Sequence, residues 1–200
     1  MSQSQNSLVT LERKTKETEI SIKFGLTPGE ISIDIGLPFF DHMLSQLAKH
    51  SSSCLKLKAI GDLEVDAHHT VEDTGILLGE ALKTAIGDKT GIVRFASVSL
   101  PLDEALIDVA LDISGRPYLG YFINFDPDTQ FLGSPGFDPQ LAEEFFRAFV
   151  TSSQITLHIN LKYGKNIHHI LEATFKGVAV CLKRAIEKSG NQIPSTKGVL

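Results

Sequence analysis

The chain repeats itself with an offset of 100 residues, and this repeat restricts the possible fold more than any other feature of the sequence. The segment that begins at Ser52 aligns without a gap on the segment that begins at Ser152. The identical pairs include Ser52/Ser152, Ser53/Ser153, Leu57/Leu157, His68/His168, His69/His169, Glu72/Glu172, Leu82/Leu182, Lys83/Lys183, Ala85/Ala185 and Ile86/Ile186. The simplest explanation is the duplication of one supersecondary unit.

Each half has the same order of predicted elements. Apolar residues alternate with other residues over 55–59 and over 155–159, which predicts half-buried strands. Helices are predicted over about 68–86 and 168–187, where apolar residues recur at three- and four-residue steps. Further helices are predicted over 39–50 and 139–150, and further strands over 20–24, 30–35, 94–100 and 105–113. The fold class is therefore α/β (α+β): two duplicated β/α halves, about 10–90 and 91–190, in one domain of residues 1–200, with helices that cover one side of a sheet. Residues 125–139 are predicted to form a long surface loop.

Composition excludes several classes of function. The chain has 200 residues, a formal net charge of -5 and a pI of about 5.8, so it lacks the cationic surface that nucleic acids or anionic membranes attract. We expect no nucleic acid partner and no membrane association, because no apolar stretch approaches the ~18 residues of a membrane span. The polar N-terminus is unlike a targeting signal. Cys54 and Cys181 lie in apolar runs and are expected to be buried thiols of a reducing compartment, which indicates a cytoplasmic location.

The motif HHxxE, present once in each half, carries the chemistry. On a helix its first histidine and its glutamate, such as His68 and Glu72, are four residues apart and share one face. The second histidine, His69 or His169, points about a quarter-turn away, so one helix start can offer ligands to two metal ions. Imidazole nitrogen with carboxylate oxygen suits divalent Mn, Fe, Co or Zn. A single histidine pair is more often structural, but its repetition in register favours metal binding.

Two further histidines are placed to complete these sites. His42 opens the predicted helix at 39–50, and His158 lies on the strand ten residues before His168. Their counterparts in the other half are Ala142 and Lys58, so each half supplies one extra histidine from a different element. Six histidines and two glutamates can hold two ions with open coordination positions, which catalysis requires. His50 is a weaker candidate, since it could equally cap the end of its helix.

Five blocks of the sequence resemble the imidazoleglycerol-phosphate dehydratase family. They are PFFDHMLSQLAKH, DAHHTVEDTGILLGEAL, LPLDEALIDVALDISGRPYLGY, HHILEATFKGVAVCLKRAI and IPSTKGVL. The likeness extends from about Thr15 to the last residue. It implies a duplicated ribosomal-protein-S5-domain-2-like fold, which agrees with the repeat.

The resemblance also implies a complete site. Two Mn2+ ions per active site would be held by His42, His68, His69, Glu72, His158, His168, His169 and Glu172. The residues expected to bind substrate are Glu17, His42, Gln46, His50, His68, Glu72, Arg94, Arg116, His168, Lys176, Ser195 and Lys197. Among these, Arg94, Arg116, Lys176, Ser195 and Lys197 would hold the substrate phosphate, because guanidinium and ammonium groups suit that anion.

The expected reaction is the dehydration of D-erythro-imidazoleglycerol phosphate to imidazoleacetol phosphate in histidine biosynthesis. The C2 proton of the substrate is not acidic, so it cannot simply be removed first. We expect the metal ions to hold the imidazole ring of the substrate as imidazolate. The electrons of that ring then expel the hydroxyl and leave a diazafulvene intermediate. Glu172 would then take the C2 proton and Glu17 would help water to leave, or the two roles could be exchanged. The resemblance further implies a 24-subunit shell with active sites between subunits. The rival interpretations are a metal-dependent hydrolase, a metal-storage protein and an RNA-binding module.

Overall fold

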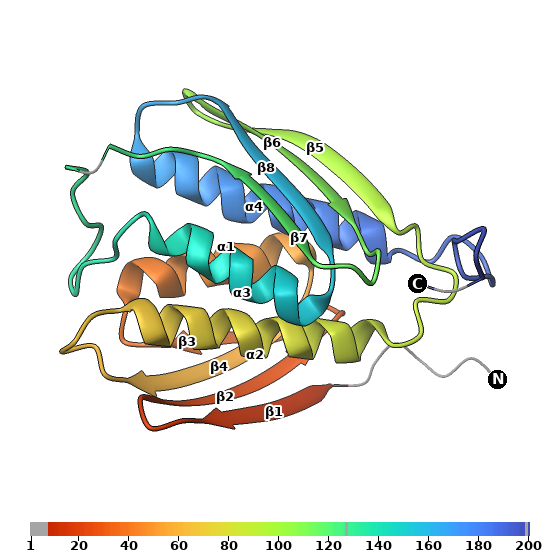
Figure 1. Cartoon of the computed structure of the whole chain (residues 1–200), viewed down its shortest axis with the longest axis horizontal. Helices are drawn as coiled ribbons and strands as arrows, with labels where there is room; N and C mark the ends of the chain where they lie inside the picture. Colours follow the sequence, from red (N-terminus) through yellow and green to blue (C-terminus); the bar gives the residue numbers. More distant parts are fainter. Residues whose placement is uncertain (1–7, 127, 199) are drawn as a thin grey trace.

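The computed structural model describes residues 8–126, 128–198 and 200, and shows two four-stranded sheets with four helices between them (Figure 1). Pro127, in the predicted loop, and the first seven residues of the polar N-terminus lie outside the described residues. Among the described residues, no helix is both long and apolar enough to span a membrane.

The two halves have the same topology, which confirms the predicted duplication. The first half contains β1 (Val9–Lys14), β2 (Thr18–Gly25), β3 (Ile31–Asp34), α1 (Pro38–Ser51), β4 (Cys54–Gly61) and α2 (His68–Ile86). The second half contains β5 (Phe95–Leu102), β6 (Ala105–Asp112), β7 (Tyr118–Phe122), α3 (Leu141–Ser153), β8 (Thr156–Tyr163) and α4 (Ile167–Ile186). The strand orders are β1-β2-β4-β3 and β5-β6-β8-β7, and in each sheet only the last pair is parallel.

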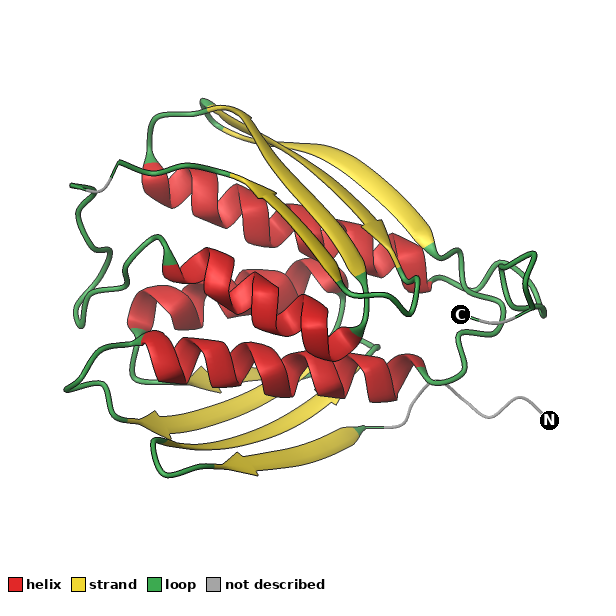
Figure 2. Ribbon diagram, in the orientation of Figure 1, coloured by secondary structure: helices red, strands yellow, loops and turns green. Residues whose placement is uncertain are grey.

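The predicted alternation of apolar residues gives each sheet one covered face. In β6, Ile107, Val109 and Leu111 are buried beneath the helices, while the residues between them lie on the outer face. The helices therefore cover one side of each sheet, and the two covered sides face one another across the helical layer (Figure 2).

Each helix lies on the sheet of its own half but pairs with a helix of the other half. α1 packs against α4 of the other half, and α3 packs against α2. A cluster of phenylalanines lies where these pairs meet, and includes Phe40, Phe145 and Phe175 with ring centroids 5.3 to 6.4 Å apart. The hydrophobic core is thus shared by both halves.

Two details of the sequence interpretation are corrected. The predicted surface loop folds back on itself, because Leu132 and Phe137 form a β-bridge, and Phe137 is fully buried between Phe39 and Phe40. Only Cys181 is a buried thiol, since Cys54 is partly exposed at the start of β4.

The contact between α2 and α3 predicts the effect of one substitution. A Cβ atom at Gly79 would lie 2.6 Å from the carbonyl oxygen of Phe149 and 2.8 Å from Cβ of Ser152. Gly79→Ala should therefore destabilise the protein by about 1–3 kcal/mol, although alanine is normally the better helix former. The check is a thermal unfolding midpoint at fixed protein concentration. Gly190→Ala is the matched control, because nothing lies within 4 Å of a Cβ there. An unchanged midpoint for Gly79→Ala would contradict this packing.

Candidate metal and substrate site

Both HHxxE motifs begin in the first turn of a helix, two residues after a side chain that accepts backbone N–H groups of the histidines. The side chain of Asn166 accepts hydrogen bonds from the backbone N–H groups of His168 and His169 at the start of α4. At the start of α2, Asp66 accepts from the N–H of His68 at 2.7 Å. These local hydrogen bonds thus fix the backbone from which each histidine pair projects.

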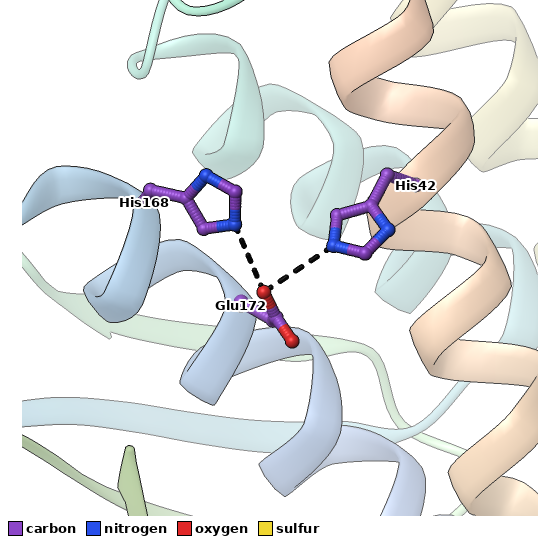
Figure 3. Close-up of side chains that lie close together, drawn as sticks. All are labelled: His42, His168 and Glu172. Carbon is purple, nitrogen blue, oxygen red and sulfur yellow. Dashed lines mark hydrogen bonds and ion pairs between the residues drawn. The ribbon is translucent and has the colours of Figure 1, made fainter. Parts of the chain in front are cut away.

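His42 of α1 and His168 of α4 converge on the carboxylate of Glu172 (Figure 3). The Nε2 atoms of His42 and His168 lie 3.3 and 2.9 Å from the same oxygen, Oε2 of Glu172. These three donors lie within 4.8 Å of one another, and they are the one such group among the described residues. The glutamate side chain is 12% exposed, whereas the two imidazoles are 43% and 45% exposed. The group therefore offers two nitrogens and one oxygen at the surface, a donor set that fits a divalent transition metal.

The same two helices continue the site away from these three residues. Gln46 and His50 follow His42 on one face of α1, and Nε2 of His50 lies 3.2 Å from Oε1 of Gln46. On α4, Nζ of Lys176 donates to Oε1 of Glu172 at 2.6 Å. Burial, and then the charge of Lys176, lower the pKa of His50. Gln46, His50 and Lys176 therefore form a polar row beside the candidate metal ligands.

Two opposing effects set the pKa of Glu172. Burial raises it, but the hydrogen bonds from Lys176, His168 and His42 together outweigh burial and bring the pKa to about 2. Glu172 is therefore ionised at neutral pH, which is the state that a metal ligand requires.

The second histidine of each motif is paired with a carboxylate from a neighbouring loop. Nδ1 of His69 lies 3.0 Å from Oδ2 of Asp62, and Nδ1 of His169 lies 2.7 Å from Oε2 of Glu104. These hydrogen bonds raise the pKa of both histidines. The bond from His169, together with backbone N–H groups of which that of Asn166 contributes most, lowers the pKa of Glu104 to about 2. Metal-binding histidines typically have one ring nitrogen held by a carboxylate in this way, which turns the other nitrogen toward the ion. Sequence reasoning missed Asp62 and Glu104, because they join the motifs only through the fold.

The first motif borders a cavity of about 860 Å³ between the two halves. His68 and Asp66 line one side of this cavity, and Glu143 and Glu144 at the start of α3 line another. The two glutamates were not predicted as site residues, although a pair of acids in a first helical turn was visible in the sequence. Glu17 lies beside this motif, with Oε2 3.9 Å from Nδ1 of His69. Glu72 is partly buried in the second turn of α2.

His158 does not join either histidine motif within this chain. Its neighbours on β8, Leu157 and Ile159, are buried under the helices, so His158 points to the outer face of the sheet. There its ring lies 5.3 Å from the ring of Tyr118. The alternation of buried residues along the strand indicates the outer face for His158, but the sequence separation of ten residues could not reveal how far His158 lies from His168.

The basic residues expected to bind phosphate lie at the other end of the molecule, except Lys176. The backbone N–H of Arg94 donates to the carbonyl of Ala185 near the end of α4, and Nη1 of Arg94 donates to the carbonyl of Pro194. Ser195 and Lys197 follow this proline, and Arg116 lies in the loop that joins β6 to β7. Residues 168 and 185 are 17 residues apart on one helix, about 25 Å at 1.5 Å per residue. One chain therefore does not bring Arg94 to its own Glu172.

The fold and the site first define a class: a duplicated β/α protein whose helix starts present histidine and carboxylate donors suited to a divalent metal. Comparison with known proteins then gives the family. The family model described as imidazoleglycerol-phosphate dehydratase matches residues 35–182. The chain belongs to the imidazoleglycerol-phosphate dehydratase family, whose members are hydro-lyases.

Individual relatives match over nearly the whole chain. A curated protein of this name from an Anaeromyxobacter species is 50% identical over 188 residues, which is 94% of this chain and 91% of the relative. One from Roseobacter denitrificans is 52% identical over 195 residues, 96% of this chain and 98% of the relative. The crystal structure of imidazoleglycerol-phosphate dehydratase from Staphylococcus aureus is 36% identical with a TM-score of 0.81, and the alignment covers 91% of this chain and 99% of that one. The Pyrococcus furiosus structure has the same identity and TM-score, with 95% and 100% coverage.

Proposed function

We propose that this chain dehydrates D-erythro-imidazoleglycerol phosphate to imidazoleacetol phosphate in L-histidine biosynthesis, with two Mn2+ ions per active site. The observation that carries the proposal is the convergence of His42 and His168 on Glu172, in a chain whose relatives bear the name of this reaction. Metal-compatible donors alone would fit a hydrolase equally well, and family membership favours the lyase.

The proposed ligands are the histidines and glutamates at the helix starts. They are His42, His68, His69, Glu72, His168, His169 and Glu172. The carboxylate partners Asp62 and Glu104 support His69 and His169 as ligands, because they hold Nδ1 and leave Nε2 available. We propose that His158 joins this set from a neighbouring copy of the chain, because its side chain lies on the outer face of the second sheet.

The active site is proposed to form between copies of the chain. About 25 Å of helix separate His168 from the end where Arg94 and Ser195 lie, so a substrate that touches both needs residues from two subunits. Each closed assembly repeats such a contact by symmetry. The 24-subunit shell implied by the sequence resemblance would supply the contact, and we adopt it as the proposed assembly.

Within this site, each residue has a proposed role. When held by these side chains, Mn2+ would provide Lewis acidity toward the substrate's imidazole ring. Glu172, ionised at neutral pH, is in the state needed to accept the C2 proton, which leaves Glu17 to donate a proton to the departing hydroxyl. Arg94, Arg116, Lys176, Ser195 and Lys197 bind the phosphate, while Gln46, His50 and the metal-binding side chains line the rest of the substrate site.

Removal and restoration of the metal test this proposal. Protein stripped by a chelator should not turn over imidazoleglycerol phosphate, and activity should return as Mn2+ is added, with imidazoleacetol phosphate as the product. The assembly state is measured in both samples, so that loss of assembly is not mistaken for loss of chemistry. Absence of turnover at saturating Mn2+ in a folded, assembled sample would overturn the dehydratase proposal.

A further inference from the structure

The guanidinium group of Arg94 is held on several sides where the linker between the halves enters β5. Its Nε and Nη2 donate to the two carboxylate oxygens of Asp112, the last residue of β6, at 2.7 and 3.2 Å. Its Nη1 donates to the carbonyl oxygen of Pro194 at 2.8 Å. The guanidinium carbon lies 4.4 Å from the centroid of the Phe95 ring. With side chains only 13% and 20% exposed, Arg94 and Asp112 form a two-pronged pair largely shielded from solvent.

The backbone at Arg94 is also constrained. Its φ is 79°, a left-handed value that residues with a side chain seldom adopt. Its N–H donates to the carbonyl of Ala185 at 2.8 Å, and its carbonyl accepts from the N–H of Ile113 at 3.1 Å. Such a conformation persists only where surrounding contacts enforce it, and residues in it are concentrated at functional sites.

Through Pro194, this arginine fastens the segment that carries two of the proposed phosphate ligands. We call residues 192–198 the C-terminal segment. Besides the Arg94 bond, the N–H of Gly91 donates to the carbonyl of Gln192 at 2.9 Å, and the N–H of Gly198 donates to the carbonyl of Ser195 at 3.0 Å. The position of Ser195 therefore depends on the linker between the halves and on the orientation of Arg94.

We propose that Asp112 is a positioning residue for phosphate recognition, which holds Arg94 so that one guanidinium binds the C-terminal segment and the substrate phosphate together. The inference rests on the proposed function, because it assigns the phosphate to Arg94. A guanidinium has five N–H donors, and Asp112 and Pro194 occupy three of them. Two donors remain for phosphate oxygens.

A purely electrostatic role for Asp112 predicts the opposite effect on binding. Asp112 offsets the positive charge of Arg94 and of Lys89, whose pKa is lowered by burial and by the charges of Lys83 and Arg94. If charge alone mattered, Asp112→Asn would make this end more positive and lower KM for a phosphate substrate. If positioning matters, the same variant raises KM. The direction of the change in KM therefore distinguishes an electrostatic role of Asp112 from a positioning role.

The test uses Asp112→Asn, Asp112→Glu and Asp108→Asn in the assembled, Mn2+-loaded enzyme. Asp108 is the matched control, because it lies on the same strand and outer face but contacts Ser99 at 2.6 Å and Lys162 at 3.6 Å. For Asp112→Asn we expect KM for imidazoleglycerol phosphate to rise about tenfold while kcat stays within about twofold. Amide hydrogen exchange in the C-terminal segment should also accelerate. Asp112→Glu should restore part of both effects, and Asp108→Asn should show neither.

The outcomes distinguish this inference from the proposed function. If the unsubstituted enzyme shows no turnover, the proposed function fails, but hydrogen exchange still tests whether Asp112 fastens the segment. An unchanged or lowered KM in Asp112→Asn, or unchanged exchange, overturns the positioning role. Should Asp112→Asn fail to assemble, Arg94→Lys replaces it in the exchange measurement, because lysine keeps the charge and loses the two-pronged pair. Unchanged exchange in that variant also overturns the inference.

Discussion

Glu172→Gln is expected to lower kcat by about 10³-fold or more, with little change in the fold. Nε2 of both His42 and His168 lies within hydrogen-bond distance of one oxygen of this glutamate, and Lys176 holds its second oxygen. Glutamine is nearly isosteric, but it carries no charge and replaces one acceptor oxygen with a donor, so it should weaken metal binding and cannot take up a proton. The measurements are steady-state turnover with Mn2+ and the metal content of the purified assembly.

Glu80→Gln is the control for this substitution, because Glu80 is an exposed glutamate on α2 away from both motifs. It should leave turnover and metal content unchanged. A Glu172→Gln enzyme with near wild-type turnover and bound metal would show that the carboxylate has no part in the chemistry. Loss of activity with full metal content would instead separate a proton-transfer role from a ligand role.

Mixed assemblies should recover activity that neither parent has. Arg94→Ala removes a proposed phosphate ligand at one end of the chain, and Glu172→Gln removes the carboxylate at the other. If a site takes Glu172 from one subunit and Arg94 from its neighbour, each variant alone has no intact site. Random co-assembly in equal amounts should leave both groups intact in about a quarter of the sites, and so give about a quarter of wild-type activity.

The matched control combines Glu172→Gln with His168→Ala. Both substitutions affect the same three-residue group within one chain, so no mixture of them restores it. This mixture should stay inactive. If the Arg94→Ala and Glu172→Gln mixture also stays inactive in verified mixed assemblies, the site does not combine Arg94 and Glu172 from different subunits.

Much of the fold could be predicted because its signals are local. Periodic apolar residues revealed α2 and α4, and the 100-residue offset revealed the duplication. The strands β1 and β7 were missed for local reasons too. β1 has only one buried residue, Val9, and β7 has Gly120 at its centre, where a strand former would be expected.

The site was harder to predict because it depends on contacts between distant residues. The HHxxE motif identifies His168 and Glu172, but nothing in the sequence reveals that Glu104, 65 residues before His169, holds that ring. The bond between Arg94 and the carbonyl of Pro194 spans 100 residues and involves no side chain of the segment that it fastens. The face on which His158 lies follows from the strand alternation, yet its distance from the histidine motifs requires the three-dimensional structure.

The crosswise packing of the helices has a consequence for the origin of the chain. In the present chain, the first helix of each half packs against the second helix of the other half. A primitive half with one sheet and two helices could therefore have buried these helix faces only by pairing with a second copy of itself. Gene fusion would have turned that encounter into an internal one, with a local concentration in the millimolar range for a short linker. Once both units were encoded together, they no longer had to be alike. One could keep His42 on its first helix while the other placed the fully buried Ala142 at the corresponding position.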